Sequence, residues 1–233
     1  MQEIQDQKQL QAYLQQYRIE DVFHEPLLPH LGLYRFEPGE VLCAQGERSE
    51  ILYVLVKGTT KTSLTSPEGK TLVLSFKTPP EMIGDIEYVE RVELMNTVEA
   101  VTPVEVLGIR YQWLYQYGQD HAPFLRFILN IITYKFRVKS ESMSFNLMYP
   151  VEIRLASYLL SVTTSEHNML LTGDPADYNL TDIANLIGTS YRHLNRVISQ
   201  FSEDGLLERT RGKLVILNRE GLEKLTGARE IVF

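Results

Sequence analysis

The segment from residue 180 to residue 217 constrains the fold more than any other part of the chain. Its first portion places apolar residues at i, i+3, i+4 and i+7, which is one face of a helix, and residues 194–201 repeat that spacing. Gly188 separates the two patterns and can adopt the left-handed conformation that ends a helix, while Ser190 can cap the helix that follows. Two short helices joined by three or four residues that include a glycine predict a helix-turn-helix.

The second of these helices has a polar face that suits DNA. Arg and Asn pair bidentately with guanine and adenine in the major groove, and the N-terminal residues of a recognition helix reach the bases. Residues 206–217 then predict a β-hairpin, or wing, with a basic turn at 209–213 that suits phosphates. We expect Arg192, Asn195 and Arg196 to read bases. Ser190 and Lys213 should mainly contact the DNA backbone and position it. The full DNA-binding set is Ser190, Tyr191, Arg192, His193, Asn195, Arg196 and Lys213.

The charge distribution supports a local DNA-binding surface. Residues 190–213 carry five basic and three acidic side chains, although the whole chain has a net charge of −7. A sequence-independent DNA coat would need a basic field over the entire molecule. A small basic surface on an acidic body fits a site-specific binder better. The alternative is a small helical subdomain with a solvated basic face.

Composition bounds the remaining possibilities. A chain of 233 residues has room for one large or two small domains, and its longest apolar run, residues 51–56, is far too short to span a membrane. The polar N-terminus has no signal-peptide core, and the single cysteine, Cys43, excludes a disulfide framework within one subunit. The five histidines have no metal-ligand spacing, and we find no phosphate-binding loop and no nucleophile elbow. The expectation is a cytoplasmic protein that is not an enzyme and uses no cofactor or metal.

The hydrophobic period changes once along the chain. Residues 30–110 show short strand-like runs separated by turn signals, with a hairpin at 66–69, which is typical of a β-sandwich or barrel. Residues 123–147 predict one long helix with two apolar stripes, and a second stripe needs either burial within one domain or a partner helix from a second subunit. We place a domain boundary near 148, which gives a sensor at 1–148 and a DNA-binding domain at 149–233. The predicted dimer contacts are Phe124, Ile128, Ile131 and Val138.

Residues 34–63, YRFEPGEVLCAQGERSEILYVLVKGTTKTS, resemble the Crp/Fnr family of bacterial transcription regulators. The residues that carry this resemblance are Phe36, Pro38, Gly39, Gly46, Glu47, Tyr53, Leu55 and Gly58. The segments MIGDIEYV and IANLIGTSYRHLNRVISQFSEDGLLE are similar to the family's pocket segment and helix-turn-helix. The resemblance implies an α+β fold with an N-terminal double-stranded β-helix (jelly roll), a long dimerisation helix and a C-terminal winged helix. The family's Glu-x-x-Ser-Arg reader retains only Arg196 here, so the family's half-site cannot be transferred.

The predicted effector pocket departs from the family. Gly84 and Asp85 could supply backbone N–H groups and a carboxylate for a ribose, but the family's phosphate-binding Arg is missing and Glu93 stands near that position. Arg48 and Arg91 are the nearest cations in sequence, and periodicity places neither beside the cradle. We therefore expect an effector other than a cyclic nucleotide, and Cys43 to be a small core residue. The pocket set is Gly84, Asp85, Ile86, Glu87, Leu94 and Met95.

The favoured function is that of a homodimeric, sequence-specific transcription regulator on an inverted-repeat operator. Its expected partners are double-stranded DNA, a second copy of the chain, RNA polymerase and an unknown small-molecule effector, with no membrane. Two alternatives stay open. A jelly-roll enzyme of the cupin type would need a His-x-His metal cluster, which the sequence lacks. A protein-interaction module with a repurposed winged helix would show no sequence-specific DNA binding.

Overall fold

The computed structural model describes residues 1–163, 180–210 and 213–227. The chain forms two compact units, Met1–Lys135 and Phe136–Phe233, and the division between them falls inside the long helix. Among the described helices, none combines the length and the hydropathy of a membrane span.

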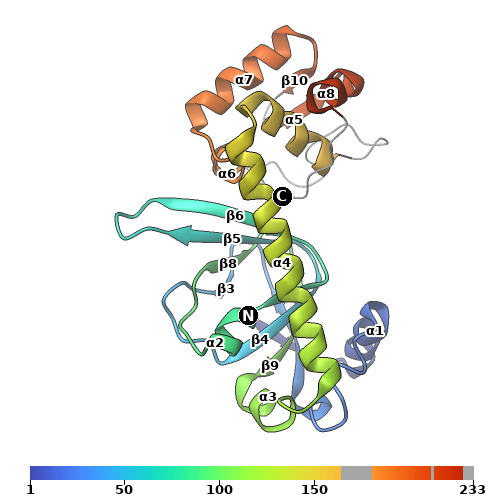
Figure 1. The fold of residues 1–233 in the computed structure, drawn as a ribbon. Coiled ribbons are helices and arrows are strands. Elements are labelled where there is room, and N and C mark those ends of the chain that lie inside the picture. The colour runs from blue at the N-terminus through green and yellow to red at the C-terminus, as the bar shows by residue number, and fades with distance from the viewer. Residues whose placement is uncertain (164–179, 211–212, 228–233) are drawn as a thin grey trace. The chain divides into compact units, whose positions relative to one another are not determined.

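Two antiparallel sheets make up the body of the first unit (Figure 1). The five-stranded sheet has the order β1 (Gln2–Ile4), β2 (Leu31–Phe36), β9 (Val104–Arg110), β4 (Ile51–Lys57) and β7 (Glu81–Ile83). The four-stranded sheet has the order β3 (Val41–Cys43), β8 (Thr97–Ala100), β5 (Thr60–Thr65) and β6 (Thr71–Lys77). Consecutive neighbours in each sheet are often distant in sequence, and the two sheets form the jelly roll that the family resemblance implied. This fold agrees with the sandwich or barrel that the turn spacing predicted.

The predicted hairpin at residues 66–69 is confirmed. β5 pairs with β6, and the backbone N–H of Ser66 donates to the carbonyl of Lys70 at 2.8 Å. Gly69 adopts a φ of +78°, which a side chain would strain. This hairpin projects from the sheet in Figure 1.

The first unit also contains short helices that the sequence did not reveal. They are α1 (Gln7–Tyr17), η1 (Leu28–His30), α2 (Asp85–Glu90) and α3 (Tyr111–Tyr117). Region 30–110 is therefore not purely β, because α2 interrupts it directly after β7. Leu10 and Leu14 of α1 are buried in one hydrophobic cluster with Leu107 of β9.

The helix α4 (Ala122–Met148) corrects the assignment of the dimer contacts. Phe124, Ile128 and Val138 are 0%, 5% and 2% exposed, and Ile131 is half-buried, so this stripe faces the subunit's own interior. The exposed stripe is the other one, whose members Leu129, Phe136, Met143 and Leu147 are 64–80% exposed. The sequence showed two stripes correctly, but periodicity cannot tell which of two apolar faces the subunit buries itself.

The second unit contains the predicted helix-turn-helix and wing. It comprises the end of α4, α5 (Val151–Val162), α6 (Leu180–Leu186), α7 (Tyr191–Glu203), β10 (Leu207–Thr210), β11 (Lys213–Ile216) and α8 (Arg219–Thr226). The predicted helix-turn-helix and wing are confirmed as α6, α7 and the antiparallel pair β10–β11. Leu194, Val197, Ile198 and Phe201 form the buried face of α7, as their spacing predicted.

Candidate DNA-binding surface and sensor pocket

The turn between α6 and α7 has the geometry that its residues predicted. Gly188 adopts a φ of +66°, which is the left-handed region that favours glycine. The Oγ of Ser190 caps α7 by accepting a hydrogen bond from the backbone N–H of His193 at 3.2 Å. Ser190 is thus committed to setting the start of α7, where a serine cap stabilises a helix by about 1 kcal/mol.

Arg154 of α5 holds this turn through hydrogen bonds to its backbone. Arg154 was not identified from the sequence as part of the site. Its Nη1 donates to the carbonyl oxygens of Ile187 and Gly188, the latter at 3.0 Å. Arg154 is only 9% exposed, and this burial lowers the pKa of its guanidinium. The signal in the sequence was a single Arg inside the apolar run of α5, because such a charge needs buried acceptors.

The polar face of α7 presents arginines to solvent. Arg192 and Arg196 are exposed and one helical turn apart, opposite the buried face. Tyr191 is 50% exposed, whereas His193 is half-buried. Of the three residues predicted to read bases, Arg192 and Arg196 are therefore the two that are exposed.

Asn195 has different surroundings from its neighbours. Its amide Nδ2 donates to the carbonyl oxygen of Tyr191 at 2.9 Å, and its Oδ1 accepts from Nη1 of Arg209 at 2.8 Å. A side chain assigned to base reading is thus tied to the wing strand β10.

The wing itself pairs as a regular hairpin. Arg209 lies opposite Leu214, and Thr210 opposite Lys213. Arg211 and Gly212 at its tip lie outside the described residues, as does the side chain of Lys213. The assignment of Lys213 to phosphate contact stays a prediction.

In the first unit, Asp85, whose carboxylate we predicted to bind an effector, pairs with Lys135. Nζ of Lys135 lies 3.0 Å from Oδ1 of Asp85 and 2.7 Å from Oε1 of Glu81, and it also donates to the carbonyl oxygen of Met82. Burial lowers the pKa of Lys135, but Asp85 and Glu81 outweigh burial, so the pKa of Lys135 is raised overall. Since an ammonium has three N–H donors, all three of its donors have acceptors here.

The other residues of the expected pocket are dispersed. The carbonyl oxygen of Gly84 accepts from the hydroxyl of Tyr111 at 2.7 Å, and Leu94 is buried in a core cluster with Cys43. Ile86 is 36% and Met95 51% exposed. Glu87 and Met95 of the predicted set line a groove of the first unit.

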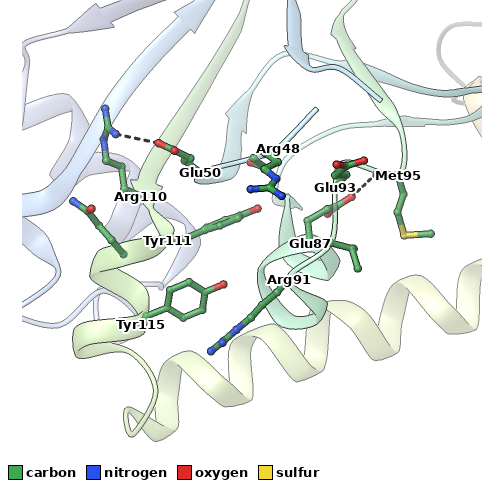
Figure 2. A pocket seen from close by; sticks show the side chains of 12 residues that line it. Arg48, Glu50, Glu87, Arg91, Glu93, Met95, Arg110, Tyr111 and Tyr115 are labelled. Atoms are coloured by element: carbon green, nitrogen blue, oxygen red, sulfur yellow. Dashed lines mark hydrogen bonds and ion pairs between the residues drawn. The ribbon is translucent and has the colours of Figure 1, made fainter. Parts of the chain in front are cut away.

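That groove, of about 1160 Å³, brings together cations that the sequence left unplaced (Figure 2). Arg110 pairs with Glu50 at 3.4 Å, and Glu87 accepts from the backbone N–H of Met95 at 3.1 Å. The guanidinium carbon of Arg91 lies 4.9 Å from the ring centroid of Tyr115. The complete lining is Arg48, Ser49, Glu50, Glu87, Arg91, Val92, Glu93, Met95, Arg110, Tyr111, Gln112 and Tyr115.

Cys43 is a buried core residue, 4% exposed. Burial raises the pKa of its thiol to about 12, with Glu87 and Glu47 adding to the effect. Among the described residues, no group of three or more His, Cys, Asp or Glu side chains is arranged to hold a metal ion.

A jelly-roll unit, a long helix and a winged helix-turn-helix with an arginine-bearing recognition helix define a class, that of DNA-binding transcription regulators. Two family models match this chain, the cyclic nucleotide-binding domain at residues 33–121 and the Crp-like helix-turn-helix domain at residues 153–225. The chain belongs to the Crp/Fnr family.

Relatives cover nearly the whole length. The regulatory protein YeiL of Escherichia coli O157:H7 is 25% identical over 205 residues, which is 88% of this chain and 90% of YeiL. The cAMP-activated global transcriptional regulator CRP of Salmonella typhimurium is 25% identical over 196 residues, 83% of this chain and 92% of CRP. The structure of a crp/fnr-family transcriptional regulator from Eubacterium rectale matches with a TM-score of 0.75 at 20% identity, covering 93% of this chain and 99% of that one.

Proposed function

We propose that this Crp/Fnr-type regulator acts in the cytoplasm as a homodimer on an inverted-repeat operator, without catalytic activity. The observation that carries the proposal is the surface of α7, where Arg192 and Arg196 are exposed beside a capped N-terminus. In helix-turn-helix proteins this part of the recognition helix enters the major groove.

The exposed stripe of α4 supports the dimer. Leu129, Phe136 and Met143 follow one another at seven-residue intervals and are 64%, 73% and 64% exposed. A soluble chain rarely leaves such a continuous apolar row in water. A second copy of α4 would cover it isologously, and this symmetry would place two recognition helices in successive major grooves, about 34 Å apart.

The proposed signal is a small molecule other than a cyclic nucleotide. Residues 93–97, where the family's phosphate-binding Arg would lie, contain no arginine, and the ammonium of Lys135 is saturated by its own acceptors. RNA polymerase is the partner through which a bound regulator would act on transcription.

Selection of bound genomic DNA fragments followed by footprinting tests the proposal. We expect an enriched palindromic consensus, with both half-sites protected over the same concentration range. Protection of one half-site only, at all concentrations, would contradict the dimer. No enriched sequence would contradict site-specific binding and would favour a protein-interaction module with a repurposed winged helix.

A further inference from the structure

The side chain of Asn195 joins the recognition helix to the wing. Its Nδ2 donates to the carbonyl oxygen of Tyr191, one turn earlier on α7, and its Oδ1 accepts from Nη1 of Arg209 on β10. The two distances are 2.9 and 2.8 Å, both within the normal range for strong hydrogen bonds.

These two partners fix the orientation of the amide. A carbonyl oxygen can only accept and a guanidinium can only donate, so the Nδ2 of Asn195 must face Tyr191 and its Oδ1 must face Arg209. Reading adenine bidentately would require the same two atoms to turn together toward N6 and N7 of the base. Asn195 would then have to release Arg209 and the carbonyl of Tyr191.

Arg209 gains a fixed position from the same contact. Arg209 is exposed, and among the described residues no carboxylate lies within ion-pair distance of it. Asn195 uses one of the five N–H donors of Arg209, and within the described part of the chain no acceptor takes the other four. A long side chain held by a hydrogen bond has already lost part of its rotamer freedom, which lowers the entropic cost of a further contact.

We infer that Asn195 is a positioning residue and that Arg209 is an additional DNA contact, which binds a backbone phosphate beside the recognition helix. The inference rests on the proposed function, because it assumes that α7 enters a major groove. A phosphate is favoured over a base edge because Arg209 lies on the wing strand β10 and not on the recognition helix, and because no described carboxylate pairs with its guanidinium.

A double-mutant cycle on the selected operator tests this inference. We expect Arg209→Ala to weaken binding about tenfold for all sequences alike, and to reduce the slope of log K against log salt by about one unit. Asn195→Ala should weaken binding severalfold in the wild-type background but less than about twofold when Arg209 is already alanine. The base preferences selected by Asn195→Ala should equal those of the wild type at every position.

Gln200→Ala is the matched control. It removes an exposed amide of α7 that bonds to Asp204 at 3.1 Å, and no hydrogen bond among the described residues joins this amide to the wing. Its affinity should stay within about twofold of wild type. Equal thermal unfolding midpoints for all variants would show that the differences arise at the DNA surface.

The possible results distinguish a failure of the proposed function from a failure of the roles inferred for Asn195 and Arg209. A wild-type protein that selects no DNA would overturn both the proposed function and this inference. Suppose that the wild type selects a palindrome, that Asn195→Ala loses the preference for one adenine, and that this loss is the same when Arg209 is alanine. The proposed function would then stand, and Asn195 would be a base reader. Unchanged affinity and salt slope with Arg209→Ala would remove the phosphate contact.

Discussion

Arg196 and Asn195 are adjacent on α7, yet their surroundings assign them different tasks. The Arg196 guanidinium is exposed, while the Asn195 amide is tied to the wing. An arginine that pairs bidentately with guanine discriminates one base pair by about 1–3 kcal/mol. Arg196→Ala should therefore cost about that much affinity and relax the selected consensus at one position.

Lys213→Ala supplies the comparison for Arg196. If Lys213 contacts a phosphate, its removal should weaken all sequences alike and lower the salt slope by about one unit. An unaltered consensus for Arg196→Ala would mean that α7 presents a different face to DNA.

Cys43 should be inert in the native protein. Its thiol pKa is raised from 9.0 to about 12, mainly by burial, so the reactive thiolate is scarce at pH 8. Because the pKa is higher in the folded state, the stability that the neutral thiol contributes is complete below pH 9 and is lost as the pH rises toward 12. Ellman's reagent at pH 8 should titrate the thiol rapidly in urea and very slowly without it. Fast labelling of the folded protein would contradict this and reopen a redox role.

Lys135 should be essential for the stability of the sensor unit. Lys135→Met would leave Glu81 and Asp85, which are 8% and 3% exposed, without their common cation. Removing one partner of a buried ion pair costs about 3–5 kcal/mol. Urea unfolding at pH 7 should show a loss of that order. Adding Glu81→Gln and Asp85→Asn should recover part of it, because those changes remove the unpaired charges. A loss below about 1 kcal/mol would mean that water replaces the ammonium.

At the scale of elements, α4 should hold the dimer through its exposed stripe. Phe136→Glu with Met143→Glu would place charges in the apolar seam between two copies, at a cost of several kcal/mol. Light scattering should then report a monomer with unchanged helical content. Asn130→Glu is the control, because it adds a negative charge at an exposed polar position of α4 and should leave the dimer mass unchanged.

Ile131→Glu with Val138→Glu gives the opposite test. Val138 is 2% exposed within the subunit, so this pair should lower the unfolding midpoint and not simply separate the dimer. A dimer mass that survives Phe136→Glu with Met143→Glu would mean that the subunits associate elsewhere.

The elements that sequence predicted well are those with a repeated local pattern. The period and the caps Ser190 and Gly188 placed α7 and its turn correctly, since both signals lie within a few residues. α8 was missed although Asn218 caps it and Gly227 ends it, because its eight residues are mostly polar.

The candidate pocket shows why contacts between distant residues could not be predicted from the sequence. Arg48, Arg91 and Arg110 are distant in sequence and meet only through the jelly-roll topology. The pairing of Lys135 with Asp85 joins residues fifty positions apart, and helical periodicity cannot show that an ammonium on α4 reaches back into β7 and α2. Local sequence patterns predict helices and strands, whereas the pairing of distant segments decides which charged side chains lie together.

At the scale of the whole molecule, the question is which effector controls DNA binding. CRP, a relative of similar length, is cAMP-activated, and its family's domain model matches residues 33–121 of this chain. A shared fold does not carry the ligand with it, because the ligand depends on the charges that line the site. Near Asp85, two lysines could in principle bind the phosphate of a cyclic nucleotide. Lys135 is saturated, and burial lowers the pKa of the second, Lys77, with Lys135 also lowering it and Glu81 raising it.

We therefore predict that cyclic AMP and cyclic GMP leave the thermal unfolding midpoint unchanged at millimolar concentration. A buried cyclic phosphate would lose its hydration, and residues 93–97 offer no arginine where the family's phosphate-binding Arg would lie. Lys135 could pair with the phosphate only by releasing Asp85 or Glu81. A ligand at 100 times its dissociation constant would stabilise the folded state by about 2.7 kcal/mol, a shift of several degrees that is easily measured. A rise abolished by Asp85→Asn or Lys77→Ala would contradict the prediction and place the nucleotide in the family's pocket. A rise that survives both changes but disappears with Arg48→Ala would equally contradict it, and would place the nucleotide in the groove of Figure 2, where Arg48 and Arg91 could meet its phosphate.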